Sequence, residues 1–123
     1  MTKPCYTSKM RNCIFCRIIA GEIPSKKLFE DDDLLAVHDV NPQAPVHFLV
    51  IPKKHIPNLM EITPEDTQLM GKILHKAQEL AVAQGCGEKG ARFVINCKTD
   101  GGQTVDHIHL HVLGGRALGW PPG

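Results

Sequence analysis

The sequence predicts an α+β fold, in which a five-stranded antiparallel sheet packs against one long and one short helix. β-prone runs follow one another with only turns between them, and a single long helical segment interrupts their order. The last run, HIHLHVLGG, alternates histidine with apolar residues, which is the period of a strand with one buried face. The chain has 123 residues, 42% of them hydrophobic, which is enough for one core. We therefore expect a single domain at 13–123 after a flexible segment at 1–12.

The first half of the chain predicts the short helix and three strands. Residues 13–24 favour a helix that ends by Gly21, because the residue before Pro24 is disfavoured in helical geometry. Residues 27–40 are typical of a hairpin with an acidic turn. Residues 47–53 form a strongly apolar run, which predicts the third strand.

The second half predicts the long helix and two further strands. Thr63 suits an N-cap, Pro64 suits the first helical turn, and Gly85 suits the end of the helix. Apolar residues recur along this segment at spacings of three and four: Leu69, Met70, Ile73, Leu74, Ala77, Leu80 and Ala81. Residues 91–98 and 105–115 are the expected fourth and fifth strands, joined by a glycine turn.

Composition excludes several classes of function. The formal net charge is +1, the basic residues are scattered, and there is one Trp and one Tyr, so polymeric nucleic acid has neither a basic stripe nor stacking platforms. The amino terminus lacks the apolar core of a signal peptide, and no run approaches the roughly 20 apolar residues of a membrane span. We expect a cytoplasmic protein without membrane contact. Its five cysteines favour reduced thiols or a metal site over disulfides.

The alternating histidines indicate chemistry on one face of the last strand. His107, His109 and His111 would share that face while the apolar residues between them enter the core. Surface histidines and a metal site are alternative interpretations. The preceding DGGQT favours catalysis on a phosphate, because its glycines allow close backbone approach and Gln103 and Thr104 add neutral donors.

A neutral imidazole can attack phosphorus near neutral pH and then depart as a good leaving group. His109 is the better candidate nucleophile, because a histidine on each side can fix its tautomer or contact the phosphate. No G-x-x-x-x-G-K-[ST] sequence is present, so the chain is not a P-loop protein.

The stretch HIHLHVLGGR fits the pattern His-φ-His-φ-His-φ-φ, where φ is apolar. Together with CIFCRIIAGEIPS, HDVNPQAPVHFLVIPKKHI, DGGQTVDHIHLHVLGGR and WPPG, it resembles the histidine triad (HIT) superfamily, and within it the Hint branch of nucleoside phosphoramidases. The resemblance covers nearly everything after about residue 12. It implies a HIT-like fold, and a homodimer in which two sheets join into one of ten strands.

The resemblance also implies a site for a purine nucleoside monophosphate and cleavage of its phosphoramidates. His109 matches the nucleophile, His111 and His47 match neighbours of the phosphate, and Thr104 matches a residue beside the leaving group. The residues matched around the nucleotide are Asp39, Val40, Asn96, Gly102, Gln103, Thr104, His109 and His111. Asp39 matches the ribose-binding acid, and a carboxylate can accept from two ribose hydroxyls at once.

The same resemblance implies a candidate site for a structural zinc. Cys13, Cys16, His55 and His107 match a Cys2His2 site in some bacterial HIT proteins. Four protein ligands leave no open position for water, so such a zinc is structural and catalysis needs no cofactor. The alternative is a pair of buried thiols without metal.

Two other functions remain open at the level of sequence. A dinucleoside polyphosphate hydrolase shares the histidine pattern, although LGGR and WPPG disfavour it. A nucleotide-binding interaction module would keep the pocket without turnover. The choice between adenine and guanine is also open.

Overall fold

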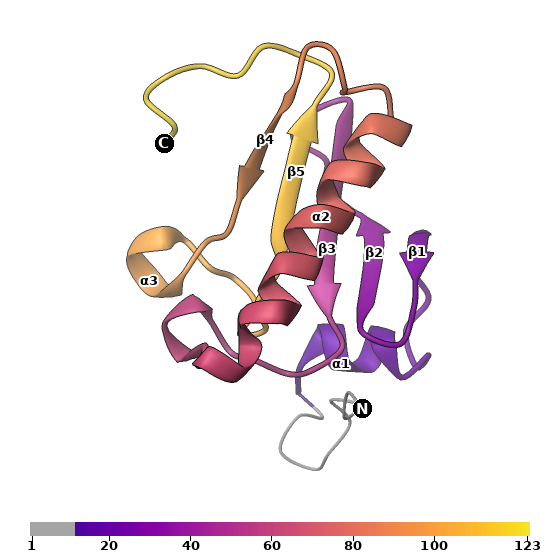
Figure 1. The fold of residues 1–123 in the computed structure, drawn as a ribbon, viewed down its shortest axis with the longest axis vertical. Coiled ribbons are helices and arrows are strands. Elements are labelled where there is room, and N and C mark those ends of the chain that lie inside the picture. The colour runs from indigo at the N-terminus through magenta and orange to yellow at the C-terminus, as the bar shows by residue number, and fades with distance from the viewer. Residues whose placement is uncertain (1–11) are drawn as a thin grey trace.

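The computed structural model describes residues 12–123 (Figure 1). The flexible segment expected at 1–12 therefore lies outside the described residues, apart from residue 12. The five expected strands form one antiparallel sheet in the order β1-β2-β3-β5-β4. The helices and strands are α1 (Ile14–Ile19), β1 (Lys27–Glu30), β2 (Leu34–His38), β3 (Val46–Pro52), α2 (Thr67–Ala83), β4 (Ala91–Val94), α3 (Lys98–Gly101) and β5 (Leu110–Gly114), with 3-10 turns at Leu59–Glu61 and Pro64–Asp66.

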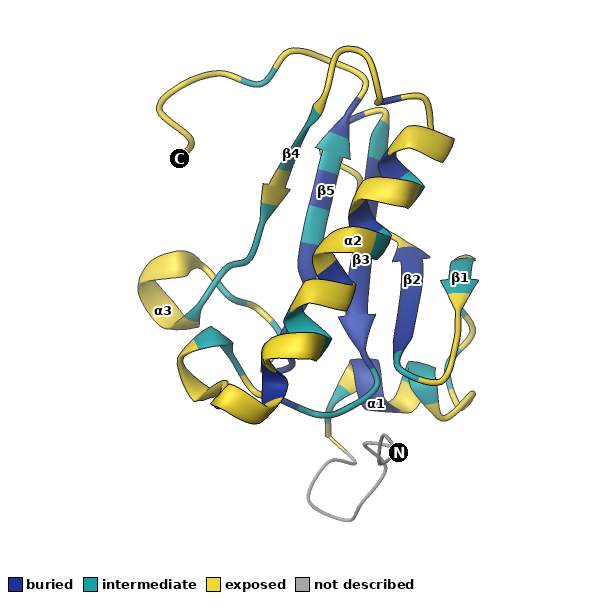
Figure 2. Ribbon diagram, in the orientation of Figure 1, coloured by how far each residue is buried: buried dark blue, intermediate teal, exposed yellow. Residues whose placement is uncertain are grey.

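Both faces of the sheet are covered, each by a different helix. α2 runs across one face, where its Ile73 packs with Phe48 and Val50 of β3 (Figure 1). The intervening Leu49 belongs to a second cluster on the opposite face, with Phe15 of α1. The central strands β2, β3 and β5 are therefore the most buried, as Figure 2 shows.

The long helix begins later than the sequence predicts. Thr63 does act as an N-cap, but it caps a 3-10 turn, and its backbone N–H donates to Asp66 Oδ2 at 2.9 Å. Asp66 is buried and also accepts from Lys54 Nζ at 2.6 Å, which holds the start of the helix to the end of β3. The expected apolar stripe is broader than the sheet can cover, because Leu74 is 53% exposed.

The last strand is shorter than expected, and the expectation that all three histidines lie on it is wrong. β5 begins at Leu110, which pairs with Val50 of β3. The β3–β5 ladder ends at this pair, although β3 itself continues to Pro52, which still pairs with Leu34 of β2. Ile108 instead donates its N–H to Ile56 at 2.7 Å. The expected alternation still holds for the apolar residues, since Ile108, Leu110 and Val112 are all buried.

The segment between β4 and β5 also differs from the prediction. β4 ends at Val94 rather than near 98, and the expected glycine turn contains the single-turn helix α3. Gly102 closes this turn with a φ of 77°, a left-handed conformation that glycine adopts without strain. The Lys98 N–H donates to Gln103 Oε1 at 2.8 Å, so a side chain outside the turn stabilises its start.

Candidate active site and metal cluster

The histidines of HIHLH enter two different clusters. His107, in the bend before β5, joins two cysteines and another histidine, whereas His109 and His111 line a cavity. Phe15 touches both clusters edge-on, with ring centroids 5.8 Å from His107 and 4.9 Å from His109. Phe15 was not among the predicted site residues, although it stands between the two cysteines of the CIFC stretch.

The cavity has a volume of about 1000 Å³ and lies on the sheet face that α1 covers. Its polar walls include five of the predicted site residues: Asp39, His47, Thr104, His109 and His111. Its apolar walls include Ile14, Phe15, Ile18, Ile23, Val37, Val40 and Leu49. Mostly apolar walls with a few convergent polar groups are typical of a small-molecule site.

Hydrogen bonds define which nitrogen of His47 carries its proton. The Gln43 backbone N–H donates to His47 Nδ1 at 3.0 Å, so the proton of the neutral ring is on Nε2. This Nε2 lies 3.0 Å from His111 Nδ1 and 3.4 Å from Asp39 Oδ2. His111 then accepts at Nδ1, and its own proton is on Nε2.

His109 has the opposite arrangement. Its Nδ1 lies 2.7 Å from the His107 carbonyl oxygen, which can only accept, so Nδ1–H donates. The Nε2 lone pair of His109 is therefore unprotonated in a neutral ring. An imidazole held in this tautomer can act as a nucleophile through Nε2.

Burial keeps these rings neutral. Desolvation lowers the pKa of His109, and it lowers the pKa of His111 to about 4. Desolvation also lowers the pKa of His47, although the charge of Asp39 opposes this shift. Near pH 7 the cavity therefore presents neutral imidazoles beside one carboxylate.

Asp39 follows β2 directly and lies at the edge of the histidine group. Its Oδ1 accepts from the Asn41 N–H at 2.8 Å, while Oδ2 faces His47. Oδ1 therefore stabilises the turn after β2, and Oδ2 lies beside the histidines that line the cavity. The adjacent Val40 lines the same cavity and is fully exposed.

Three of the predicted nucleotide-binding residues do not line this cavity: Asn96, Gly102 and Gln103. The Gln103 side chain is already occupied within its loop. Its Nε2 donates to the carbonyl oxygens of Pro57 at 2.7 Å and Val105 at 2.9 Å, and its Oε1 accepts from Lys98. In this structure both amide protons are donated to backbone carbonyls, so a contact between Gln103 and a phosphate would require the side chain to turn, and its role at the phosphate stays a prediction.

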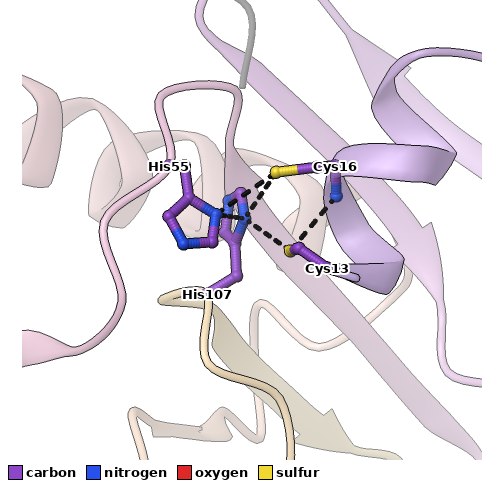
Figure 3. Close-up of side chains that lie close together, drawn as sticks. All are labelled: Cys13, Cys16, His55 and His107. Carbon is purple, nitrogen blue, oxygen red and sulfur yellow. Dashed lines mark hydrogen bonds between the residues drawn. The ribbon is translucent and has the colours of Figure 1, made fainter. Parts of the chain in front are cut away.

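The second cluster gathers Cys13, Cys16, His55 and His107 (Figure 3). Cys13 is the N-cap of α1 and Cys16 lies one turn later, so both sulfurs lie at the same end of that helix. His55 follows β3 and His107 precedes β5. The four potential ligand atoms all lie within 4.8 Å of one another.

The spacing of these atoms fits a tetrahedral zinc. Bonds of about 2.0–2.3 Å from zinc to nitrogen and sulfur imply ligand separations of roughly 3.3–3.8 Å. His107 Nδ1 lies 3.3 Å from Cys13 Sγ, 3.6 Å from Cys16 Sγ and 3.1 Å from His55 Nδ1. His107 Nε2–H donates to the Pro52 carbonyl at 2.7 Å, which leaves the Nδ1 lone pair directed at the cluster.

The protonation chemistry of the cluster also suits a metal. Desolvation lowers the pKa of His107 to about 4 and lowers the pKa of His55, so both rings offer lone pairs near pH 7. Burial raises the pKa of the Cys13 thiol, a direction that a bound cation would reverse. Cys16 is disulfide-bonded in the structure, so the expectation of reduced thiols over disulfides is wrong for this residue. Its sulfur becomes a thiolate ligand only after reduction.

A second metal-like group, formed by Asp39, His47 and His111, is better explained as a hydrogen-bonded chain. His47 Nε2 carries the proton of the neutral ring, because Nδ1 already accepts from the backbone. Binding a metal through Nε2 would require His47 to lose that proton and become an anion. The two clusters therefore differ in which atoms have free lone pairs.

Comparison with known proteins identifies relatives of this architecture. The family model described as "HIT domain" matches residues 20–118. An uncharacterised HIT-like protein from Synechocystis sp. is 56% identical over 110 residues, which is 89% of this chain and 96% of the relative. The crystal structure of a HIT family hydrolase from Legionella pneumophila Philadelphia 1 superposes with a TM-score of 0.90 at 52% identity, covering 91% of this chain and all of that one.

A third relative bears on the Cys/His cluster. The crystal structure of a zinc-bound histidine triad family protein from Mycobacterium smegmatis has a TM-score of 0.73 and 35% identity, over 85% of this chain and 76% of that one.

Across residues 12–123, no helix has the length and apolar content needed to span a membrane.

Proposed function

This chain belongs to the HIT domain family, and from that premise we propose that it hydrolyses the P–N bond of purine nucleoside 5′-phosphoramidates, as a Hint-type enzyme. One observation carries the proposal. His109 is held by the His107 carbonyl in the tautomer whose Nε2 lone pair is free, in a cavity shared with neutral His47 and His111. Such a lone pair is what nucleophilic attack on phosphorus requires.

The proposed reaction has two steps. In the first, a bond forms between His109 Nε2 and phosphorus while the P–N bond to the amine breaks, and the amine departs with one added proton. In the second, water attacks phosphorus, the bond to His109 breaks, and the proton consumed in the first step is returned. His111 Nε2–H supports both steps as a donor to a phosphate oxygen, and the Thr104 hydroxyl can relay the proton beside the leaving amine.

The nucleoside end of the cavity supports the choice of substrate. The Asp39 carboxylate lines the cavity and can accept from ribose hydroxyls, and Val40 adds an exposed apolar surface next to it. Apolar side chains such as Leu49 and Ile18 offer faces for a planar base.

The test is a single-turnover assay on the purified protein with an adenosine 5′-phosphoramidate. We expect stoichiometric nucleoside monophosphate and amine, with a nucleotide covalently attached to His109 when the reaction is quenched early. His109→Ala should give no labelled protein. Binding of the nucleotide without turnover would instead identify an interaction module, and preferential cleavage of a dinucleoside polyphosphate would identify the other hydrolase type.

We further propose that Cys13, Cys16, His55 and His107 hold one structural zinc when the cysteines are reduced. The separations of their ligand atoms, the free Nδ1 of His107 and the zinc-bound relative support this assignment. A closed set of four protein ligands contributes stability by tying α1 to the segments that flank β3 and β5.

We also propose a homodimer with a continuous ten-stranded sheet. β4 is an outer strand of the five, and Phe93 on it is 43% exposed. Leu74 and Val82 of α2 are each 53% exposed, so a second copy would cover an open edge and an apolar helix face together. A solution mass of twice 13.6 kDa at micromolar concentration is expected, and a monomer would contradict the proposal.

A further inference from the structure

Ser25 is a half-buried residue with a buried hydroxyl oxygen that the mechanism does not use. Its Oγ is buried, and within residues 12–123 it has no hydrogen-bond partner. Ser25 also lines the large cavity. A buried hydroxyl without a partner is disfavoured in a folded protein, and it requires an explanation such as a ligand that is bound during function.

The backbone places Ser25 beside the nucleoside end of the cavity. The His38 N–H donates to the Lys26 carbonyl at 3.0 Å, so the segment that contains Ser25 runs next to the end of β2. Asp39, the proposed ribose ligand, is the next residue after His38. Ser25 therefore lies on a segment adjacent to Asp39, the proposed ribose ligand. His109, the proposed nucleophile, lies on a different segment, between α3 and β5.

The surroundings of Ser25 leave its hydroxyl as a neutral polar contact for a base. Ile23 precedes it in the cavity wall, and Val37 lies on the neighbouring strand. Apolar side chains can cover the faces of a purine but cannot satisfy its polar edge. A serine hydroxyl supplies one donor and two acceptor lone pairs, and rotation about its χ1 bond can redirect it between staggered positions.

We propose that Ser25 is a base-binding residue that hydrogen-bonds the polar edge of the purine base. This inference rests on the proposed function. Because the hydroxyl can donate to guanine O6 or accept from the adenine amino group, it recognises a purine edge without separating adenine from guanine. Nucleotide binding supplies a partner for a hydroxyl that has none among residues 12–123.

The experiment measures binding of AMP, GMP and ribose 5-phosphate to Ser25→Ala and to the unchanged protein. We expect the dissociation constants of AMP and GMP to rise together by about tenfold, the range for one lost hydrogen bond to a buried group. Binding of ribose 5-phosphate, which has no base, should not change. Ser25→Cys, a close match in size with a weak donor, should behave like the alanine variant.

Stability supplies a readout that distinguishes a ligand contact from a structural role. Removing a hydroxyl without a partner should leave the unfolding midpoint of the free protein unchanged or raise it. The matched control is Thr67→Ala, because Thr67 Oγ1 donates to the Pro64 carbonyl at 2.9 Å outside the cavity. That control should lower the midpoint and leave AMP binding unchanged.

The outcomes separate the inference from the proposed function. If the unchanged protein binds neither AMP nor GMP, the proposed function and the inference both fail. If it binds AMP and Ser25→Ala binds it equally well, only the inference fails. An equal loss of ribose 5-phosphate affinity, or a lower unfolding midpoint for Ser25→Ala, would show a structural role and overturn the base contact.

Discussion

His107 and His109 lie two residues apart, yet they present opposite nitrogens. His107 donates its Nε2–H to the Pro52 carbonyl and directs Nδ1 at the cysteines, whereas His109 donates its Nδ1–H to the His107 carbonyl and keeps Nε2 unprotonated. Both rings are buried and both are neutral near pH 7. The difference between a metal ligand and a nucleophile therefore comes from the carbonyl that each ring meets.

The first prediction has the largest expected effect, and it concerns the catalytic activity of the cavity cluster. His109→Ala should reduce turnover of an adenosine phosphoramidate by at least about a thousandfold, equivalent to roughly 4 kcal/mol of transition-state stabilisation. The zinc content and the binding of AMP should change little, because the four side chains of the Cys/His cluster are untouched. His75→Ala, on the exposed side of α2, is the control for loss of a histidine. More than a few per cent of residual activity would place the nucleophile elsewhere.

The second prediction tests the Cys/His cluster by stability. Reduced protein should contain about one zinc per chain, and His107→Ala should lose the metal and unfold about 10 °C lower, equivalent to roughly 3 kcal/mol. His111→Ala, its counterpart in the cavity, should keep the zinc and lose less stability. Metal analysis and thermal unfolding with and without a chelator measure both. Metal-free protein of unchanged stability would favour buried thiols over a zinc site.

Sequence patterns predicted the five strands and the helices α1 and α2, but they did not predict where α2 begins, where β4 ends or where β5 begins. The alternation in HIHLH correctly placed Ile108, Leu110 and Val112 in the core. It could not show that the β3–β5 ladder ends at Val50 and Leu110, because that depends on which strand becomes the neighbour. His107 consequently lies in a bend, although the period-two pattern places it on a strand.

Parts of the candidate site could not be predicted from local sequence patterns, because they depend on contacts between residues far apart in the chain. The membership of the Cys/His cluster came only from resemblance, because residues 39 to 94 positions apart meet there. The tautomers of His47 and His109 depend on a backbone N–H and a backbone carbonyl, whose positions require the folded chain. The hydrogen bonds of Gln103 could not be predicted for a similar reason, since its partner Pro57 lies 46 residues away.

The third prediction uses Gln103, whose loop connects the two clusters. Gln103→Ala removes three hydrogen bonds that fix the segment leading to His107, and we expect a cost of about 1–2 kcal/mol. Both zinc affinity and kcat/KM should fall, each by about tenfold. Metal titration and steady-state kinetics on the same preparation measure the two effects. A loss confined to kcat/KM would instead indicate that the Gln103 amide turns toward the phosphate.

The fourth prediction concerns pH and has the smallest effect. Burial lowers the pKa of His109, His111 and His47, so the unfolded chain binds more protons than the folded one below the ordinary histidine pKa of about 6.5. Stability should therefore be unaffected by these groups above that pH. It should fall as the pH drops from about 6.5 towards 4, the pKa to which burial lowers His111.

The same pKa shifts predict where kcat/KM begins to fall on the acid side of its pH profile, which we call the acid limb. Because kcat/KM reports groups of the free enzyme, it should stay level through pH 6.5 and decline only below it. The charge of Asp39 raises the pKa of His47 and of His109 against the effect of burial, so Asp39→Asn should move the limb further down, by less than about one pH unit. The shape of the profile separates this shift from the weaker ribose binding that the same variant should show. Asp100→Asn, on the exposed α3, should leave the limb in place, and a limb at or above 6.5 in the unchanged protein would contradict neutral, buried imidazoles.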